Sequence, residues 1–324
     1  MTGMIIRRLF IAVFVMLMAS FLSFSLLFFA PGNPAEVIIR QQTGLDPTFY
    51  EIELFMEQHG LNRPFLTQCS QWLYLIARGD LGVSLRTGEP VLEEFAARFG
   101  ATLELAVTAV TISVVIALPL GIFAARKPNS LFDHVTRIAA LAGISIPDFW
   151  LGLMLMVCFA LVLGWLPCFG YGTLMHLILP ATTLGVGMTA SLMRLMRASM
   201  LEVLHLDYIK TARAKGLRET VIIWKHALKN ALIPVVTVLG MQFGHLLAGA
   251  VVVETVFAWP GIGKFLIDSI YARDYTVIQG FVLIIAAIFV LVNLLVDILY
   301  AWLDPRVRYV KERGVNPVAT PERS

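Results

Sequence analysis

Long apolar stretches constrain this chain more than any other feature of its sequence. Six segments are mostly apolar and about 20 residues or longer, the length at which a helix can cross a bilayer. Of the 324 residues, 58% are hydrophobic and only 15% are charged. Backbone groups in lipid must pair within their own segment, so we predict an all-α polytopic membrane protein with six transmembrane helices. These helices are expected at roughly 9–30, 101–125, 138–165, 174–193, 232–257 and 278–303.

The fourth segment is the weakest, because Pro180, Gly185 and Gly187 interrupt it. A membrane helix tolerates such residues when neighbouring helices cover the backbone groups that they free. We count it as a span because the charge distribution requires an even number of crossings. The first segment imitates a signal peptide, but its apolar run from Phe10 to Phe29 is longer than an h-region, so we expect an uncleaved helix.

Lysine and arginine residues orient the chain, because cytoplasmic loops carry an excess of them. With the N-terminus inside, 18 of the 25 basic residues fall on the cytoplasmic side, and eight of these lie in the loop 194–230. The reversed arrangement would place that loop outside. We therefore predict that both termini are cytoplasmic.

The apolar segments also divide the chain into regions. Residues 1–30 form an N-terminal transmembrane helix, whereas 31–97 are too long for a plain loop. Helical spacing broken by Pro, Gly and acidic residues predicts an external subdomain of short helices there, with interfacial helices as the alternative. Residues 98–303 hold the other five spans and the cytoplasmic loop 194–230, and 304–324 form a polar cytoplasmic tail.

The sequence contains no pattern that is typical of an enzyme. The stretch WPGIGKF (259–265) fails as a phosphate loop, because Ala258 replaces the first glycine and Phe265 replaces the hydroxyl residue. Cys69, Cys158 and Cys168 lack metal-ligand spacing, and a net charge of +3 is too small to indicate nucleic acid. We therefore expect no catalytic residue, cofactor, metal or nucleic-acid partner.

A few polar residues in or beside the spans are candidates for a transport pathway, since ionisable groups in a membrane often have a function. These are Asp148, Gln242 and His245, although a histidine bonded between helices is the commoner arrangement. Glu104 and Glu254 are expected near the outer face, where water can reach them. The acidic residues do not cluster near the membrane midplane, which argues against a proton-coupled carrier.

The basic loop 194–230 has a helical pattern despite its charge. Apolar residues recur every three or four positions in 198–208 and again in 221–228, and Gly216 separates the two runs. Glycine readily takes the left-handed conformation that ends a helix, so we predict helix, glycine turn and helix. Such a hairpin can rest on anionic lipid or dock on a soluble protein. Small residues at 211, 212 and 214 allow close approach and favour a protein partner.

Several stretches resemble permeases of binding-protein-dependent ABC importers, and more narrowly the dipeptide, oligopeptide, glutathione and nickel branch. DYIKTARAKGL and HALKNALIPVVT resemble the cytoplasmic signature loop of that family. The general pattern is Glu-Ala-Ala, three residues and Gly; here it reads Lys210-Thr211-Ala212 and Gly216, with Lys in place of the general Glu. Nearly the whole chain is similar, in APGNPA, GDLGVSL, RFGATLELA, SIPDFWLG, RASMLEVL, VVETVFAWPGIGKFLIDSI, RDYTVIQG and NLLVDILYAWLDPRVR.

The resemblance implies a type I ABC importer permease fold, also called MetI-like, in the inner membrane of a bacterial or archaeal cell. Its implied partners are a homologous second permease, two cytoplasmic ATPase subunits, an external substrate-binding protein and membrane lipid. ATP would be hydrolysed on the ATPase subunits, while this chain forms half of the translocation pathway. The residues expected to couple to an ATPase are Asp207, Tyr208, Lys210, Thr211, Ala212, Arg213, Ala214, Lys215, Gly216, His226 and Asn230.

The substrate stays open at this stage. Di- and oligopeptides are the first expectation, and nickel, a nickel chelate or glutathione is the alternative, because these importers share the motifs. The short segment 164–181 is similar to that of nickel and glutathione members. A secondary carrier or channel and a membrane scaffold that recruits a cytoplasmic protein are other classes. The lack of an internal repeat argues against the carrier.

Overall fold

The computed structural model describes residues 2–248 and 250–303, which fold as helices joined by turns, with one isolated bridge between Val83 and Pro90. Five helical segments in this part are long and apolar enough to cross a membrane. The prediction of an all-α polytopic membrane protein is therefore confirmed. The five are α1 (Thr2–Phe28), α5 (Val91–Arg126), α8 (Leu174–Leu204), the continuous segment Glu219–Leu247 that ends in α11 (Leu228–Leu247), and α14 (Tyr275–Leu303).

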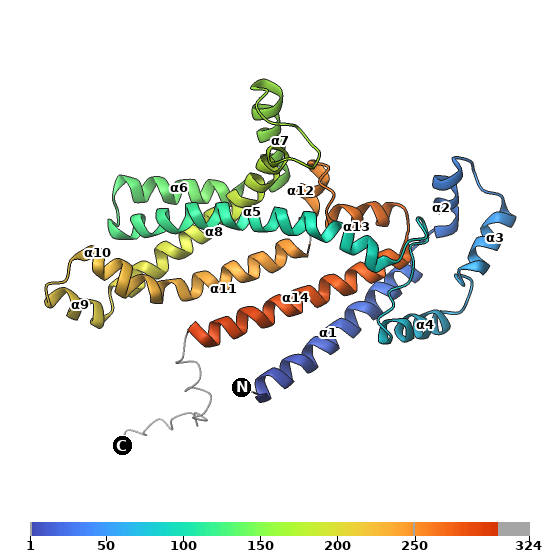
Figure 1. The fold of residues 1–324 in the computed structure, drawn as a ribbon, viewed down its shortest axis with the longest axis horizontal. Coiled ribbons are helices and arrows are strands. Elements are labelled where there is room, and N and C mark those ends of the chain that lie inside the picture. The colour runs from blue at the N-terminus through green and yellow to red at the C-terminus, as the bar shows by residue number, and fades with distance from the viewer. Residues whose placement is uncertain (1, 249, 304–324) are drawn as a thin grey trace, which may run out of the picture.

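The long helices lie side by side along one direction, with short helices at both ends (Figure 1). The helices α5, α8 and α11 pack against one another, and α14 packs against both α11 and α1. At one end lie α2 (Pro34–Thr43), α3 (Phe49–Gln58) and α4 (Phe65–Ala77), and at the other lie α9 (Asp207–Ala214) and α10 (Glu219–Val221). The start of α1 and the end of α14 lie toward the α9 end (Figure 1). The predicted tail 304–324 lies outside the described residues.

The third predicted span, a continuous helix over 138–165, is wrong. The structure instead has α6 (Leu131–Ser145) and α7 (Asp148–Leu155), which a π-helical turn extends to Val162, and the two axes differ by 102°. Pro147 causes the break, because proline lacks an N–H and forces the preceding residue out of the helical region. Ile146 accordingly has φ −84° and ψ 124°. Counted as one broken span, this pair raises the number of crossings to the predicted six.

The fifth predicted span, 232–257, is also wrong at both ends. The helical segment begins at Glu219 and ends at Leu247, and the residues beyond it form the separate short helix α12 (Val251–Val256). A turn then leads into α13 (Ile262–Tyr271). Glu254 therefore lies on α12 and not on a long span, which changes its surroundings.

The short helices of 31–90 have strong end signals. Asn33 caps α2 by accepting a hydrogen bond from the N–H of Ala35 at 2.9 Å, and Gly44 ends it with φ 71°. Thr48 and Glu51 form a capping box at the start of α3, in which each side chain accepts from the other's backbone N–H. The prediction of short helices in this region agrees with these three elements.

Candidate functional site

The basic loop folds as the helix, glycine turn and helix that its pattern predicts. Helix α9 ends at Ala214, and Gly216 follows it in the left-handed region with φ 75°. The N–H of Gly216 donates to the carbonyl of Arg213 at 2.9 Å, and the N–H of Leu217 donates to Ala212. These bonds satisfy carbonyls that the end of a helix otherwise leaves open. The chain then turns back through α10 into α11.

One face of α9 is buried against the bundle. Ile209 is fully buried and Ala212 is 7% exposed, and both pack with Ile222, Ile223 and Met200 in one apolar cluster. The small patch predicted at 211–214 is therefore wrong in one respect, because Ala212 faces the interior and is unavailable to a partner. Thr211 and Ala214 remain exposed.

Polar contacts hold α9 to the next helical segment. The guanidinium of Arg213 forms an ion pair with Glu219, at 2.8 Å from Nη2 to Oε1 and 3.2 Å from Nε to Oε2. The hydroxyl of Tyr208 donates to the carbonyl of His226 at 3.3 Å and accepts from the Asn230 amide at 2.8 Å. The structure thus brings together four residues predicted for coupling, and it adds Glu219, which sequence reasoning missed.

Charges on the outer face of α9 lie in solvent. The Lys210 ammonium is 2.8 Å from Oδ1 of Asp207 and lowers the pKa of that carboxyl through a hydrogen bond and its charge. Lys215 is also exposed. Between these charges the loop exposes apolar side chains, with Leu206 at 45% and Trp224 at 56% of their surface accessible. Exposed aromatic side chains beside basic residues are typical of a surface that binds another protein.

The three residues predicted for a transport pathway lie on two helices and have different surroundings. The Gln242 amide on α11 donates to Ser191 on α8 at 2.7 Å, and its Oε1 is buried without a hydrogen bond to any described residue. Asp148 begins α7 and lies beside Gly187, since a Cβ on that glycine would be 3.6 Å from Oδ1. Gly187 and Ser191 are one turn apart on α8, so Asp148 and Gln242 approach neighbouring positions. His245 is exposed and makes no hydrogen bond to the described residues.

Glu254 lies on α12, just before the turn that leads into α13, and the expectation that water reaches it is wrong. Its side chain is fully buried. Oε1 accepts a hydrogen bond from the Thr102 hydroxyl on α5 at 2.7 Å, and Oε2 accepts from the N–H of Lys264 at 2.9 Å. The Thr102 oxygen also accepts from the N–H of Ile262 at 2.9 Å. Glu104, in contrast, is exposed as predicted.

Two further features hold this turn, and they explain the WPGIGKF stretch. The Trp259 indole is buried and donates to the carbonyl of Ala101 at 2.8 Å. A Cβ on Gly261 would overlap the Glu254 carboxylate, so only glycine fits there. The stretch therefore anchors the turn to α5, in agreement with a structural role rather than a phosphate loop.

The described residues contain no group of three metal-binding side chains, and the three cysteines are free thiols. Cys69 is buried, Cys158 is exposed and Cys168 is partly exposed. Nothing in this arrangement points to a resident metal or a disulfide among those residues.

Family models match the chain along most of its length. Residues 117–309 match the model described as "Binding-protein-dependent transport system inner membrane component". Residues 1–106 match the N-terminal model of the same transport system component. The two matches together cover the external subdomain, the bundle and the basic loop.

Individual relatives give the same result. The chain is 43% identical to the dipeptide transport system permease protein DppB of Alkalihalophilus pseudofirmus, over 94% of this chain and 98% of the relative. It is 42% identical to the glutathione transport system permease protein GsiC of Escherichia coli K12, over 95% of this chain and 100% of that protein. A solved inward-facing structure of the MetNI methionine ABC transporter matches with a TM-score of 0.57 at 20% identity, covering 67% of this chain and 99% of the matched chain.

Proposed function

The chain belongs to the family of binding-protein-dependent transport system inner membrane components, and on that premise we propose that it carries short peptides into the cell. It is the membrane-spanning permease of an ABC importer in the peptide and glutathione branch, and ATP is hydrolysed on separate subunits. Di- and oligopeptides are the proposed cargo, and glutathione is the second candidate. The observation that carries the proposal is the end-to-end identity of 43% and 42% with a dipeptide and a glutathione permease.

Peptide cargo is favoured over a nickel complex because both of those relatives are named for peptide-like substrates. The near-equal identities do not separate a dipeptide from glutathione. The separating experiment measures ligand affinity of the cognate external binding protein by calorimetry, followed by uptake into proteoliposomes. We expect competition by unlabelled dipeptides. Uptake that only glutathione or only a nickel salt inhibits would contradict the proposed cargo.

We further propose that the basic loop contacts one ATPase subunit and transmits its movement to the bundle. Support comes from the shape of the loop. One face of α9 is buried, and the Arg213–Glu219 ion pair joins it to the next helical segment. Its outer surface exposes basic residues together with Leu206 and Trp224. Because the buried face of α9 packs against α8 and the segment that leads into α11, a displacement of α9 is expected to move both helices. ATP must then bind more tightly to one of the two conformations of the assembly.

Gly216→Val tests this coupling. Gly216 has φ 75° and open space around its missing side chain, so the substitution acts through backbone conformation and through bulk on the outer surface. Gly44→Val is the matched control, because Gly44 has φ 71°, equally open space and a position on the opposite end. We expect Gly216→Val to lower ATP-driven uptake about tenfold or more while Gly44→Val retains it, because both variants share the backbone strain and only Gly216 lies at the proposed ATPase contact, where a few residues carry most of the binding energy. Equal uptake by both variants would contradict the coupling role.

The partners follow from the same proposal: a homologous second permease, two ATPase subunits and an external binding protein. Both termini are proposed to be cytoplasmic, which the common end of α1, α14 and α9 supports. Affinity purification of the tagged chain should recover the second permease and ATPase subunits. Recovery of this chain by itself, in a membrane that expresses all of them, would contradict the assembly.

A further inference from the structure

Asp148 stands out because the helices around it carry no other carboxylate, ammonium or guanidinium near their middles. No Asp, Glu, Lys or Arg occurs at 105–125 of α5, 174–193 of α8 or 230–247 of α11, and 138–175 contains only Asp148. Asp148 begins α7, is exposed, and makes no ion pair or hydrogen bond with the described residues. A carboxylate that faced lipid at this depth would be costly, so we expect it to face water or a positive charge.

One stripe of α8 is open along its length. Its residues recur at spacings of four, three and four, and all are at least partly exposed: Gly187, Ser191, Arg194 and Ala198. On the other side of α8, three residues are fully buried: Leu192, Met196 and Met200. Asp148 lies at the start of the stripe, since a Cβ on Gly187 would be 3.6 Å from its Oδ1. From there the stripe runs toward the α9 end of the bundle (Figure 1).

Polar groups follow this stripe. The Ser191 hydroxyl accepts from the Gln242 amide of α11 at 2.7 Å, and Oε1 of Gln242 is buried without a partner among the described residues. A buried carbonyl oxygen without a donor is unfavourable, so an N–H group that arrives beside Ser191 would gain a hydrogen bond. Arg194 follows, exposed and without an ion pair to the described residues. Helical side chains lean toward the N-terminus of their helix, which directs Arg194 back toward Ser191.

The two opposite charges are separated by the length of a short peptide. Gly187, which lies beside Asp148, and Arg194 are seven positions apart, which is about 10.5 Å along the helix axis. An extended chain covers at most about 3.3–3.6 Å per residue, so roughly three residues fill this distance. The backward lean of the long Arg194 side chain shortens it, and a dipeptide then fits as well. Longer peptides would extend past one of the two charges.

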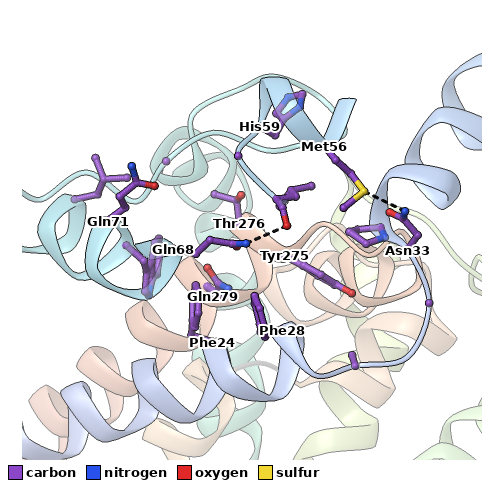
Figure 2. A pocket seen from close by; sticks show the side chains of 18 residues that line it. Phe24, Phe28, Asn33, Met56, His59, Gln68, Gln71, Tyr275, Thr276 and Gln279 are labelled. Carbon is purple, nitrogen blue, oxygen red and sulfur yellow. Dashed lines mark hydrogen bonds between the residues drawn. The ribbon is translucent and has the colours of Figure 1, made fainter. Parts of the chain in front are cut away.

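The outer pocket shown in Figure 2 lacks this combination of charges. Its lining residues include no Asp or Glu. The Arg273 guanidinium lies against the wall residue Gly32, where a Cβ would be 2.8 Å from it, and the Arg63 side chain lies against Gly60. The Gln68 amide already donates to two backbone carbonyls, at 3.0 and 2.8 Å. That pocket therefore offers no carboxylate to an ammonium group, whereas the stripe on α8 offers both signs of charge.

We propose that Asp148 and Arg194 bind the two ends of a short peptide cargo along the open stripe of α8. The inference rests on the proposed function, which supplies the peptide. The Asp148 carboxylate accepts hydrogen bonds from the amino-terminal ammonium, and the Arg194 guanidinium donates two N–H bonds to the terminal carboxylate. A peptide N–H between these ends donates to Oε1 of Gln242. The preferred cargo is thus a di- or tripeptide with both ends free.

Binding of three probes to the complete transporter in nanodiscs, without nucleotide or binding protein, tests the proposal. The probes are Ala-Phe-Ala, N-acetyl-Ala-Phe-Ala and Ala-Phe-Ala-amide, and their Kd values come from saturation-transfer NMR titrations. In the unmodified transporter we expect each blocked probe to bind about tenfold more weakly, because it loses a charge-assisted hydrogen bond. Asp148→Asn should remove only the preference for a free amino end. Arg194→Gln should remove only the preference for a free carboxyl end.

Asp46→Asn and Arg63→Gln are the matched controls, because both side chains are exposed among the short helices at the outer end. Both controls should keep both preferences. Each preference is a ratio between probes on one protein, so partial unfolding of a variant does not imitate the expected result. Equal binding of all three probes to the unmodified transporter would overturn the inference. A variant of Asp148 or Arg194 that keeps both preferences, or loses both, would overturn it as well.

Uptake separates this inference from the proposed function. ATP-driven uptake of Ala-Phe-Ala into proteoliposomes, with the cognate binding protein, tests peptide import by the unmodified transporter. Uptake together with equal binding of the three probes would leave peptide import standing and overturn the site on α8. Failure to take up any di- or tripeptide would overturn peptide import itself.

Discussion

The two ends of the bundle are built in opposite ways. At the α12–α13 turn, buried groups bond to one another: Glu254 is fully enclosed and linked to Thr102 and to the backbone of α13. At the basic loop, α9 buries one apolar face, but its polar contacts lie at the surface, where the Arg213 and Glu219 side chains are 44% and 42% exposed. Buried polar networks are rigid and costly to disturb, whereas exposed ion pairs contribute little. The turn is therefore fixed by its own chain, and the loop leaves room for a partner.

This contrast fits the proposed work of each end. A loop that follows an ATPase subunit gains from exposed polar contacts that can rearrange while its buried apolar face stays packed. The turn at the other end serves as a fixed point against which α5 and α13 are held. Substitutions at the turn are therefore expected to lower thermal stability, and substitutions at the loop are expected to lower uptake per ATP hydrolysed.

Gly261→Val should have the largest effect on stability. The added side chain would overlap the Glu254 carboxylate, which is buried and cannot move into water. Overpacking that also displaces a buried carboxylate is expected to cost about 3 kcal/mol or more. Thermal unfolding of the purified protein in detergent measures it. Gly100→Val is the control, because nothing lies within 4 Å of a Cβ at Gly100; equal losses in both variants would contradict the anchoring role.

Thr102→Val should have an intermediate effect. Valine has the shape of threonine but cannot donate to Glu254 or accept from the N–H of Ile262. Leaving these buried groups without partners is expected to cost about 1–3 kcal/mol, which the same thermal measurement detects. The matched control is Thr108→Val on the same helix, where the hydroxyl bonds only to the carbonyl of Glu104 in its own helix. A larger loss at Thr108 would break the comparison.

Much of the fold was predictable from composition and periodicity, because a lipid environment allows few structures. The failures have local causes. A run such as 138–165 is apolar throughout, and apolarity alone does not reveal that Pro147 redirects the chain by 102°. The end of α11 at Leu247 was hidden in the same way, since the apolar run continues into α12.

The site residues show where pattern reasoning stops. Spacing predicted the glycine turn at Gly216, because a left-handed conformation has a residue preference. It did not predict that Ala212 faces inward or that Arg213 pairs with Glu219, since both depend on how α9 packs against another segment. The burial of Glu254 depends on Thr102, which is 152 positions away in the sequence. Contacts of this range need the tertiary structure.

Arg213→Gln should have the smallest effect on stability and thereby sharpens the comparison. The ion pair with Glu219 is more than a third exposed, so water and salt screen it, and its loss is expected to cost about 0.2–1 kcal/mol. Coupling should suffer more, because Arg213 ties α9 to the segment that leads into α11. We expect thermal unfolding close to that of the unmodified protein, together with a several-fold fall in uptake per ATP hydrolysed. The matched control is Arg40→Gln, whose exposed ion pairs join Glu36 within α2 and Asp46 in the turn after it, at the end of the molecule remote from the loop. A large loss of stability in Arg213→Gln would show that this exposed ion pair stabilises the loop as strongly as the buried network stabilises the turn. That result would contradict the proposed difference between the two ends.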